Sequence, residues 1–174
     1  MNVPSIYDTE KYQILSVSGT YTCPPGCKYI QVEAVGAGGS GARTTGLISG
    51  GSGGSGGYFK KYYTAANYAY TIGTGGAAVI TLGGLGLAGG ATLFSVDSAG
   101  GGAGGALLTG GIGGAVTAAN ALLKKVGLTG LLGSKTGGTL LFGTEIGSGG
   151  FGAKSIDLGS TAGNNGLIIV TEFY

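Results

Sequence analysis

The sequence predicts a mainly β protein, in which a glycine-rich, β-sandwich-like sheet continues into extended polyglycine-type segments, with little helix. Two observations support this fold class. Glycine supplies 43 of the 174 residues, and short runs rich in strand-forming residues lie near both ends and in the middle of the chain. Because glycine has no side chain to build a core, we expect stability to come partly from backbone hydrogen bonds and partner chains.

Composition separates this fold class from two other kinds of glycine-rich chain. Collagen needs glycine at every third position and abundant proline, whereas this chain has three prolines and no sustained triplet register. A disordered linker needs low hydrophobicity, whereas 43% of the residues are apolar, the mean hydropathy is +0.37 and only 9% are charged. What remains is a scaffold in which backbones pack directly against each other.

The chain is expected to form a single glycine-rich domain over residues 1–174, with residues 1–14 as an N-terminal arm. Residues 13–21, a tight turn at Cys23-Pro24-Pro25-Gly26-Cys27 and the alternating residues 29–35 predict a half-buried hairpin. Two interpretations of Cys23 and Cys27 stay open: a short-loop disulfide across the turn, or two reduced thiols at strand ends. Two cysteines and no histidine are too few ligands for a zinc site, so no metal is expected.

The middle and the end of the chain predict three more strands. Residues 58–63 and 68–72 are tyrosine-rich and flank a short loop, which suits cross-strand ring pairs, although tyrosine rings also stack on sugars. Residues 167–174 form a terminal strand that must pair with another strand. We expect its partner to be the strand at residues 29–35.

Glycine runs at residues 36–57, 83–90, 99–115 and 147–152 lie between these strands. Packed helices of the polyproline II type are one solution, because they make no internal hydrogen bonds and must bond to their neighbours. Glycine-rich loops wrapped on a β-sandwich are the alternative. Residues 107–146 form a leucine-rich insert, in which the spacing of Ala119, Leu122, Leu123 and Val126 predicts a short helix over residues 118–126.

Residue types that carry enzyme chemistry are missing or scattered. The chain has no histidine, its seven carboxylates are dispersed, and no serine lies in a strand-elbow-helix context. Gly84 to Gly89 matches G-x-G-x-x-G, but no helix follows it, so no nucleotide cofactor is expected. We therefore expect a protein that is not an enzyme, with no catalytic, cofactor-binding or metal-binding residues.

Charge and hydropathy limit the partners. The net charge of +2 comes from scattered lysines and a single arginine, so no nucleic-acid surface is predicted. No stretch approaches the roughly 20 apolar residues of a membrane helix, so no membrane insertion is expected. Asp8 and Glu10 in the first ten residues argue against a signal peptide.

The order of several segments resembles the glycine-rich domain of phage virion proteins. The segments include Gly-Ala-Gly-Gly at 36–39, directly after Ile-Gln-Val-Glu-Ala-Val, and the terminal Leu-Ile-Ile-Val-Thr-Glu-Phe-Tyr. The full set lies at residues 18–22, 25–26, 30–39, 53–58, 70–76, 89–94, 100–105 and 166–174. The resemblance covers about residues 15–106 and 147–174. Related phage adhesins use packed polyglycine helices to present variable host-binding loops, so it implies a virion part.

This resemblance implies a tail-fibre, tail-tip or adhesin component that acts in host attachment, with a capsid decoration, head-fibre or other structural coat protein as the alternative. The partners implied are further copies of the chain, most simply a trimer, other virion proteins, and a host cell-surface receptor or glycan. The location implied is the virion, assembled in the host cytoplasm. Receptor or partner contacts are expected at residues 43–48 and 107–141, through Arg43, Leu122, Leu123, Lys124, Lys125 and Lys135.

Overall fold

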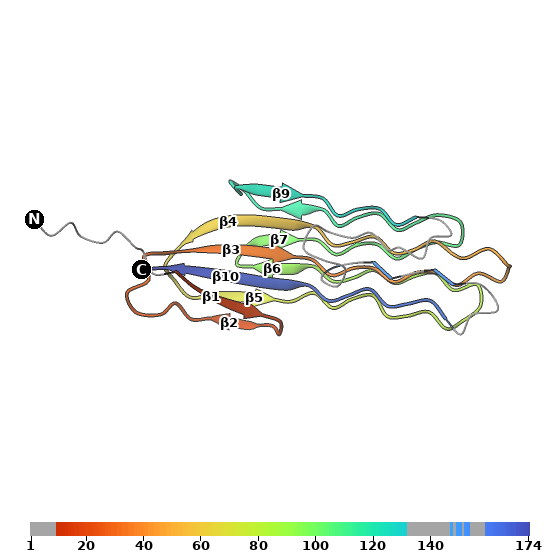
Figure 1. Ribbon diagram of the computed structural model, residues 1–174, viewed down its shortest axis with the longest axis horizontal. Coiled ribbons are helices and arrows are strands. Elements are labelled where there is room, and N and C mark those ends of the chain that lie inside the picture. Colours follow the sequence, from red (N-terminus) through yellow and green to blue (C-terminus); the bar gives the residue numbers. More distant parts are fainter. Residues whose placement is uncertain (1–9, 132–146, 148, 151, 154–158) are drawn as a thin grey trace, which may run out of the picture.

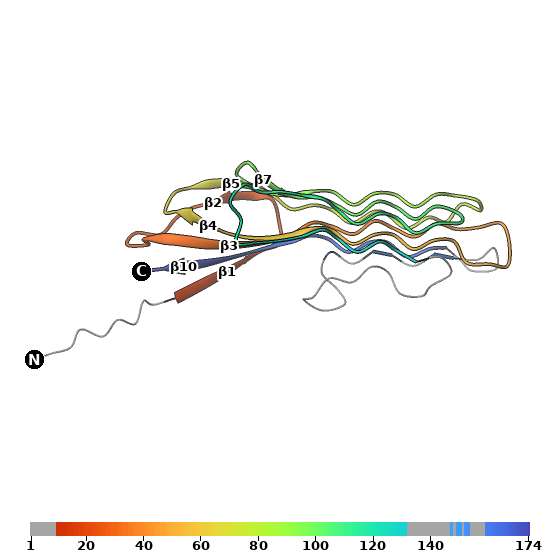
Figure 2. The same ribbon diagram turned by 90° about the horizontal axis from the view of Figure 1, so that it is seen from above.

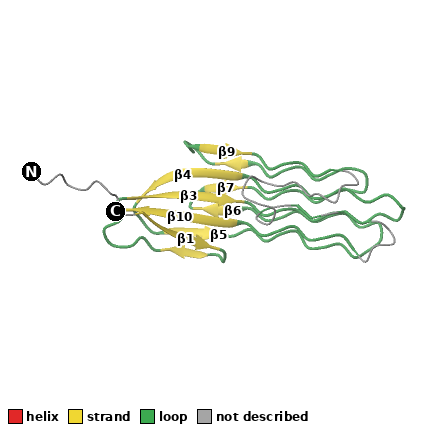
Figure 3. Ribbon diagram, viewed as in Figure 1, coloured by secondary structure: helices red, strands yellow, loops and turns green. Residues whose placement is uncertain are grey.

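The computed structural model describes residues 10–131, 147, 149–150, 152–153 and 159–174. These residues form an elongated molecule with a β-sandwich at one end and long parallel excursions of the chain at the other (Figures 1 and 3). The described part is all-β, with two antiparallel sheets and no helix, which confirms the predicted fold class.

The two sheets lie face to face at the sandwich end (Figure 2). The first sheet has the order β1 (Glu10–Leu15), β10 (Leu167–Phe173), β3 (Tyr29–Val35), β4 (Tyr58–Thr64) and β9 (Leu123–Lys125). The second has the order β2 (Gly19–Tyr21), β5 (Tyr68–Thr71), β6 (Thr92–Phe94), β7 (Asp97–Ala99) and β8 (Val116–Thr117).

Strand β10 is an inner strand of the first sheet and lies between β1 and β3. It pairs antiparallel with β3 along its whole length, with Val170 opposite Val32, which confirms the predicted pairing of the terminal strand. Its other neighbour is β1, so residues 10–14 belong to an edge strand and not to an arm. The predicted hairpin of residues 13–21 with 29–35 is wrong. β1 and β2 lie in different sheets, and β2 pairs with β5.

A compact core fills the space between the sheets. Its largest buried side chains include Tyr21, Phe59 and Phe94, together with Ile30, Val32, Ile168 and Val170 of the central strands. Two buried carboxylates are held by hydrogen bonds inside the sandwich. Glu172 accepts hydrogen bonds from Tyr21 (2.9 Å) and Gln13 (2.7 Å). Asp97 accepts from Tyr63 (2.6 Å) and pairs with Lys61 (2.7 Å). These groups tie β1, β2, β4, β7 and β10 together.

Beyond the sandwich, the glycine-rich segments run side by side as extended chains (Figure 1). The segments are residues 36–44, 50–57, 73–80, 84–91, 99–106, 109–115, 127–131 and 159–166, to which residues 147, 150 and 153 also bond. They bond to one another through backbone groups, and we call this array the glycine lattice. Of the two predicted solutions, the structure has the packed one.

Hydrogen bonds in the glycine lattice repeat every three residues. Along residues 36–44, the amides of 36, 39 and 42 donate to the segment 50–57, those of 37, 40 and 43 donate to 84–90, and those of 38 and 41 donate to 161–164. Three directions in three residues define a threefold helix of the polyproline II type. A β-strand would alternate with a period of two instead.

Close backbone approach explains why the segments are glycine-rich. A Cβ on Gly102 would lie 2.0 Å from the carbonyl oxygen of Gly54, a distance that no Cβ tolerates. Serine enters the lattice where its hydroxyl takes part in the bonding. The Oγ of Ser55 accepts from the Leu128 amide at 2.7 Å, and that of Ser52 accepts from the Leu131 amide at 2.8 Å. Both serines are fully buried.

The predicted helix at residues 118–126 is wrong. Residues 118–122 form the turn between β8 and β9, and residues 123–125 are β9, which pairs with β4. Asn120 has a positive φ of 54°, which suits a turn and not a helix. Residues 109–115 and 127–131 are part of the glycine lattice, so the described part of the leucine-rich segment is continuous with the fold and is not an insert.

Candidate binding surface

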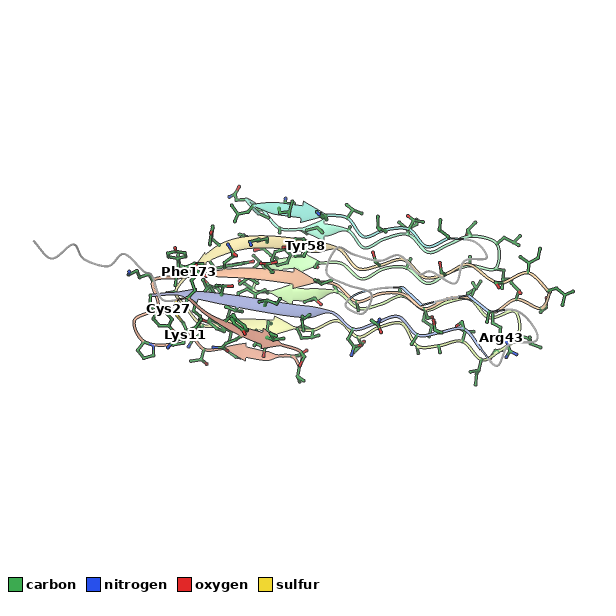
Figure 4. The ribbon with its side chains drawn as sticks, in the orientation of Figure 1. Lys11, Cys27, Arg43, Tyr58 and Phe173 are labelled. Carbon is green, nitrogen blue, oxygen red and sulfur yellow. The ribbon has the colours of Figure 1, made fainter. Side chains whose placement is uncertain are left out.

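The end of the molecule away from the sandwich is made of chain reversals. We call it the turn end and define it as residues 44–49, 80–84 and 107–109. These reversals join neighbouring segments of the glycine lattice and carry side chains at the end of the molecule (Figure 4). Side chains on these turns are free of the steric limit that applies at lattice positions where two backbones meet.

The turn 44–49 is held in shape by hydrogen bonds within the chain. Thr44 Oγ1 donates to the carbonyl of Ile48 at 2.5 Å, and the Thr44 amide donates to the carbonyl of Ala153 at 3.1 Å. Gly46 sits at the tip, where an added Cβ would meet nothing within 4 Å. The turn is therefore anchored at its base and open at its tip.

A shallow apolar hollow of about 360 Å³ lies at this end. It is lined by Thr44, Thr45, Gly46, Leu47, Ile48, Leu107 and Leu108. Leu47 is 75% exposed, Ile48 is 67% exposed and Leu108 is 71% exposed. Large apolar side chains at this level of exposure lose water when a partner covers them, so the hollow can bind an apolar surface.

Of the predicted contact residues that the structure describes, Arg43 is the one that lies beside the turn end, directly before the turn 44–49 (Figure 4). Its amide donates to the carbonyl of Gly84 at 3.0 Å, and its guanidinium donates to the carbonyl of Ile80. These contacts tie the turn at residues 80–84 to the neighbouring segment. Arg43 therefore supports the turn end from within the structure.

The other predicted contact residues lie elsewhere. Leu122, Leu123, Lys124 and Lys125 lie on or beside β9, at the edge of the sandwich. The structure therefore does not bring Arg43 together with them. Leu122 is exposed, and its amide donates to the carbonyl of Lys60 at 2.8 Å. Lys135 lies outside the described residues.

Cys23 and Cys27 lie at the sandwich end as free thiols. The turn between them is closed by the Cys27 amide, which donates to the carbonyl of Pro24 at 3.3 Å, and Gly26 has a φ of 86°. Burial raises the pKa of the Cys23 thiol, and a hydrogen bond with Cys27 raises it further. The disulfide stays a prediction. No cluster of three or more metal-ligating side chains occurs within the described ranges.

The tyrosines serve mostly as packing groups. Tyr63 and Tyr68 meet edge to face at 5.5 Å, and each packs on Phe94 of the core. On the outer face of the first sheet, Tyr29 stacks on Phe173 with ring centroids 4.6 Å apart. This agrees with the expectation of cross-strand ring pairs.

The contact regions predicted at residues 43–48 and 107–141 contain the residues that line the hollow, but sequence reasoning did not predict that they meet. It also did not identify the two buried carboxylates. Leu47, Ile48, Leu107 and Leu108 flank glycine runs, and large apolar residues directly after a polyglycine segment are the signal that marks a chain reversal here. Glu172 and Asp97 carry no local signal, because their partners are far away in the sequence.

The architecture defines a class: an all-β protein whose sandwich carries a lattice of packed glycine-rich chains. Residues 15–173 match the family model of a glycine-rich domain, and the chain belongs to that family. No curated protein matches the chain. Among the described residues, no helix is of a length and apolar character that would let it cross a bilayer.

Proposed function

We propose that this protein is a non-enzymatic component of a phage virion surface, a tail-fibre, tail-tip or adhesin subunit that acts in host attachment. One observation carries the proposal: the glycine lattice holds an apolar turn end at the far end of the molecule from the sandwich (Figure 2). The lattice is cross-linked by backbone hydrogen bonds along its length, so it can hold the turns in place at a distance.

The two ends of the molecule differ in structure and therefore suit different roles. The sandwich has the buried core and the bound carboxylates, and it suits a fixed connection to other virion proteins. The turn end has exposed apolar side chains on short loops, which can vary without disturbing the lattice. A host cell-surface receptor or glycan is the partner proposed for this end.

A structural coat, decoration or head-fibre protein is the second candidate. One observation favours it: exposed apolar side chains also occur along one long side of the molecule, outside the turn end. They are Ile112, Leu122, Val126, Leu128 and Leu131. Such residues suit burial against other subunits, and the low fraction of charged residues agrees with this.

The two candidates are separated by substitutions at the turn end of the protein in its phage. We expect Leu47→Lys with Ile48→Lys to leave particle assembly intact and to lower host adsorption at least about tenfold, because charges in the hollow oppose burial. Val96→Lys is the matched control, because Val96 is 86% exposed on the turn between β6 and β7. Particles that lack the Leu47→Lys, Ile48→Lys protein would support the coat role. Normal adsorption by normally assembled particles would contradict the attachment role.

A further inference from the structure

One long side of the glycine lattice has no further segment beside it among the residues that the structure describes. We call it the open side and define it as residues 109–117 and 122–131. It runs past β8 and β9, the edge strands of the two sheets, and continues along the outermost lattice segments (Figure 1). It therefore follows almost the whole length of the molecule.

Backbone groups on the open side repeat every three residues without a partner in the described part of the chain. The amides of Gly111 and Gly114 donate inward, to the carbonyls of Ser52 and Ser55 at 2.8 Å. The amides of Ile112 and Ala115, one position further along, have no described acceptor. The carbonyls of Gly110 and Gly113 and the amide of Thr129 likewise lack described partners. These groups are placed to bond a further extended chain.

The side chains on the open side are apolar and exposed. Ile112 is 70% exposed, Leu131 is 60% exposed and Leu128 is 56% exposed. No charged residue occurs between Asp97 and Lys124, or from residue 126 to 131. Lys124 and Lys125 of β9 are the charged residues on the open side, at its sandwich end. Its lattice part is uncharged and apolar, so this part does not repel a copy of itself and gains free energy when it is covered.

The short distance between neighbouring backbones in the glycine lattice limits which kind of partner can pack on the open side. Where 109–115 meets 127–131, a Cβ on Gly110 would lie 1.7 Å from the carbonyl of Gly130. Helices that pack at this distance must present glycine backbone with bonding groups at a period of three. A second copy of this chain supplies such a segment, with the same spacing and the same lack of charge.

We propose that the open side is a self-association surface, on which a second copy of the chain continues the glycine lattice. Bonds from the Ile112 and Ala115 amides to the second copy repeat the pattern that 109–115 already makes within the chain. The exposed side chains of Ile112, Leu128 and Leu131 flank these bonds and become buried. The proposal does not depend on host attachment and is tested on the purified protein.

Analytical ultracentrifugation over a range of concentrations measures the association. We expect the wild-type chain to sediment above the 16.7 kDa of one copy. Ile112→Lys with Leu131→Lys should raise the dissociation constant at least about tenfold, because charges would be buried without partners. Val96→Lys adds a charge at an exposed apolar position away from the open side and should leave the constant unchanged.

A proline variant tests the backbone bonds separately. Proline fits the φ of a polyproline-type helix, and at position 112 it removes an amide that has no described partner within the chain. Ile112→Pro should therefore fold, as judged by circular dichroism, and should dissociate. In the wild type, hydrogen exchange at Ile112, Ala115 and Thr129 should slow as concentration rises.

Three results would overturn the proposal. The first is a wild-type chain that sediments as one copy at every concentration. The second is association that persists unchanged in folded Ile112→Pro, or that is lost equally in Val96→Lys. The third is a rate of hydrogen exchange at the amides of Ile112, Ala115 and Thr129 that does not change with protein concentration. Because it is measured on the wild-type chain, this result applies even if the substituted chains do not fold.

Discussion

At the scale of single residues, the structure depends on which side chains can be buried in the glycine lattice and which can be buried in the sandwich. Ser52 and Ser55 are fully buried in the glycine lattice because each hydroxyl replaces a backbone acceptor. Buried carboxylates in the sandwich have the opposite requirement: Glu172 and Asp97 are stable inside only because hydroxyl, amide and ammonium groups surround them.

Gly102 tests the tight packing of the lattice. We expect Gly102→Ala to lower the free energy of unfolding by about 3 kcal/mol or more, because the new Cβ would meet the backbone of Gly54 and the lattice cannot shift locally. The matched control is Gly46→Ala at the turn tip, where an added Cβ meets nothing within 4 Å. Urea unfolding of both variants measures the difference. Equal midpoints would show that the segments are not close-packed.

Tyrosines that donate to carboxylates make stability sensitive to alkaline pH. Burial, followed by the hydrogen bond to Asp97, raises the pKa of Tyr63. Burial and the hydrogen bond to Glu172 raise the pKa of Tyr21 in the same way. Burial and the hydrogen bond to Glu33 raise the pKa of Tyr58. The hydrogen bond to Glu172 raises the pKa of the half-buried Tyr174 to about 12.

Above a pH of about 10, these tyrosines lose their protons in the unfolded chain but keep them in the folded chain. The unfolded state then binds fewer protons, so we expect the contribution of these tyrosines to the free energy of unfolding to be constant below pH 10 and to fall as pH rises further. Urea midpoints from pH 8 to pH 11 measure this, with absorbance at the phenolate band as a second readout. Tyr63→Phe should make the fall shallower. A free energy of unfolding that rises above pH 10 would contradict the assignment of these hydrogen bonds.

At the scale of elements, the sequence predicts the strands with clear alternation and fails where elements are short. Strands β3 and β10 alternate between core and surface, and their pairing was predictable because a terminal strand needs a partner. Strands β1 and β2 were not separable, because the three residues from Ser16 to Ser18 between them carry no strong turn signal.

Residues 118–126 show how a helical spacing can mislead. Leucines and alanines at spacings of three and four residues match a helix face, but they also occur where a turn and a short edge strand follow each other. Asn120, which adopts positive φ more readily than most residues, was the signal for the turn. The pairing of β9 with β4 depends on residues more than sixty positions away, and no local pattern contains that information.

At the scale of the whole molecule, backbone hydrogen bonds hold the glycine lattice together in place of a packed side-chain core. Segments inside the lattice, such as residues 36–44, bond outward in three directions, so a single extended chain has no stability alone and the lattice forms cooperatively. The resulting body keeps the turn end away from the sandwich and leaves the open side along its length (Figure 1). The proposed roles in attachment and self-association both follow from that shape.

Residue-resolved hydrogen exchange along residues 100–106 tests the lattice most directly. The amides of Gly102 and Gly105 donate to the segment 37–40, and those of Ala103 and Ala106 donate to 109–112, whereas those of Gly101 and Gly104 have no described acceptor. We therefore expect fast exchange at Gly101 and Gly104 and slow exchange at the positions between and after them, a period of three. Uniformly fast exchange, as in unpaired loops, or a period of two, as in an edge β-strand, would contradict the account.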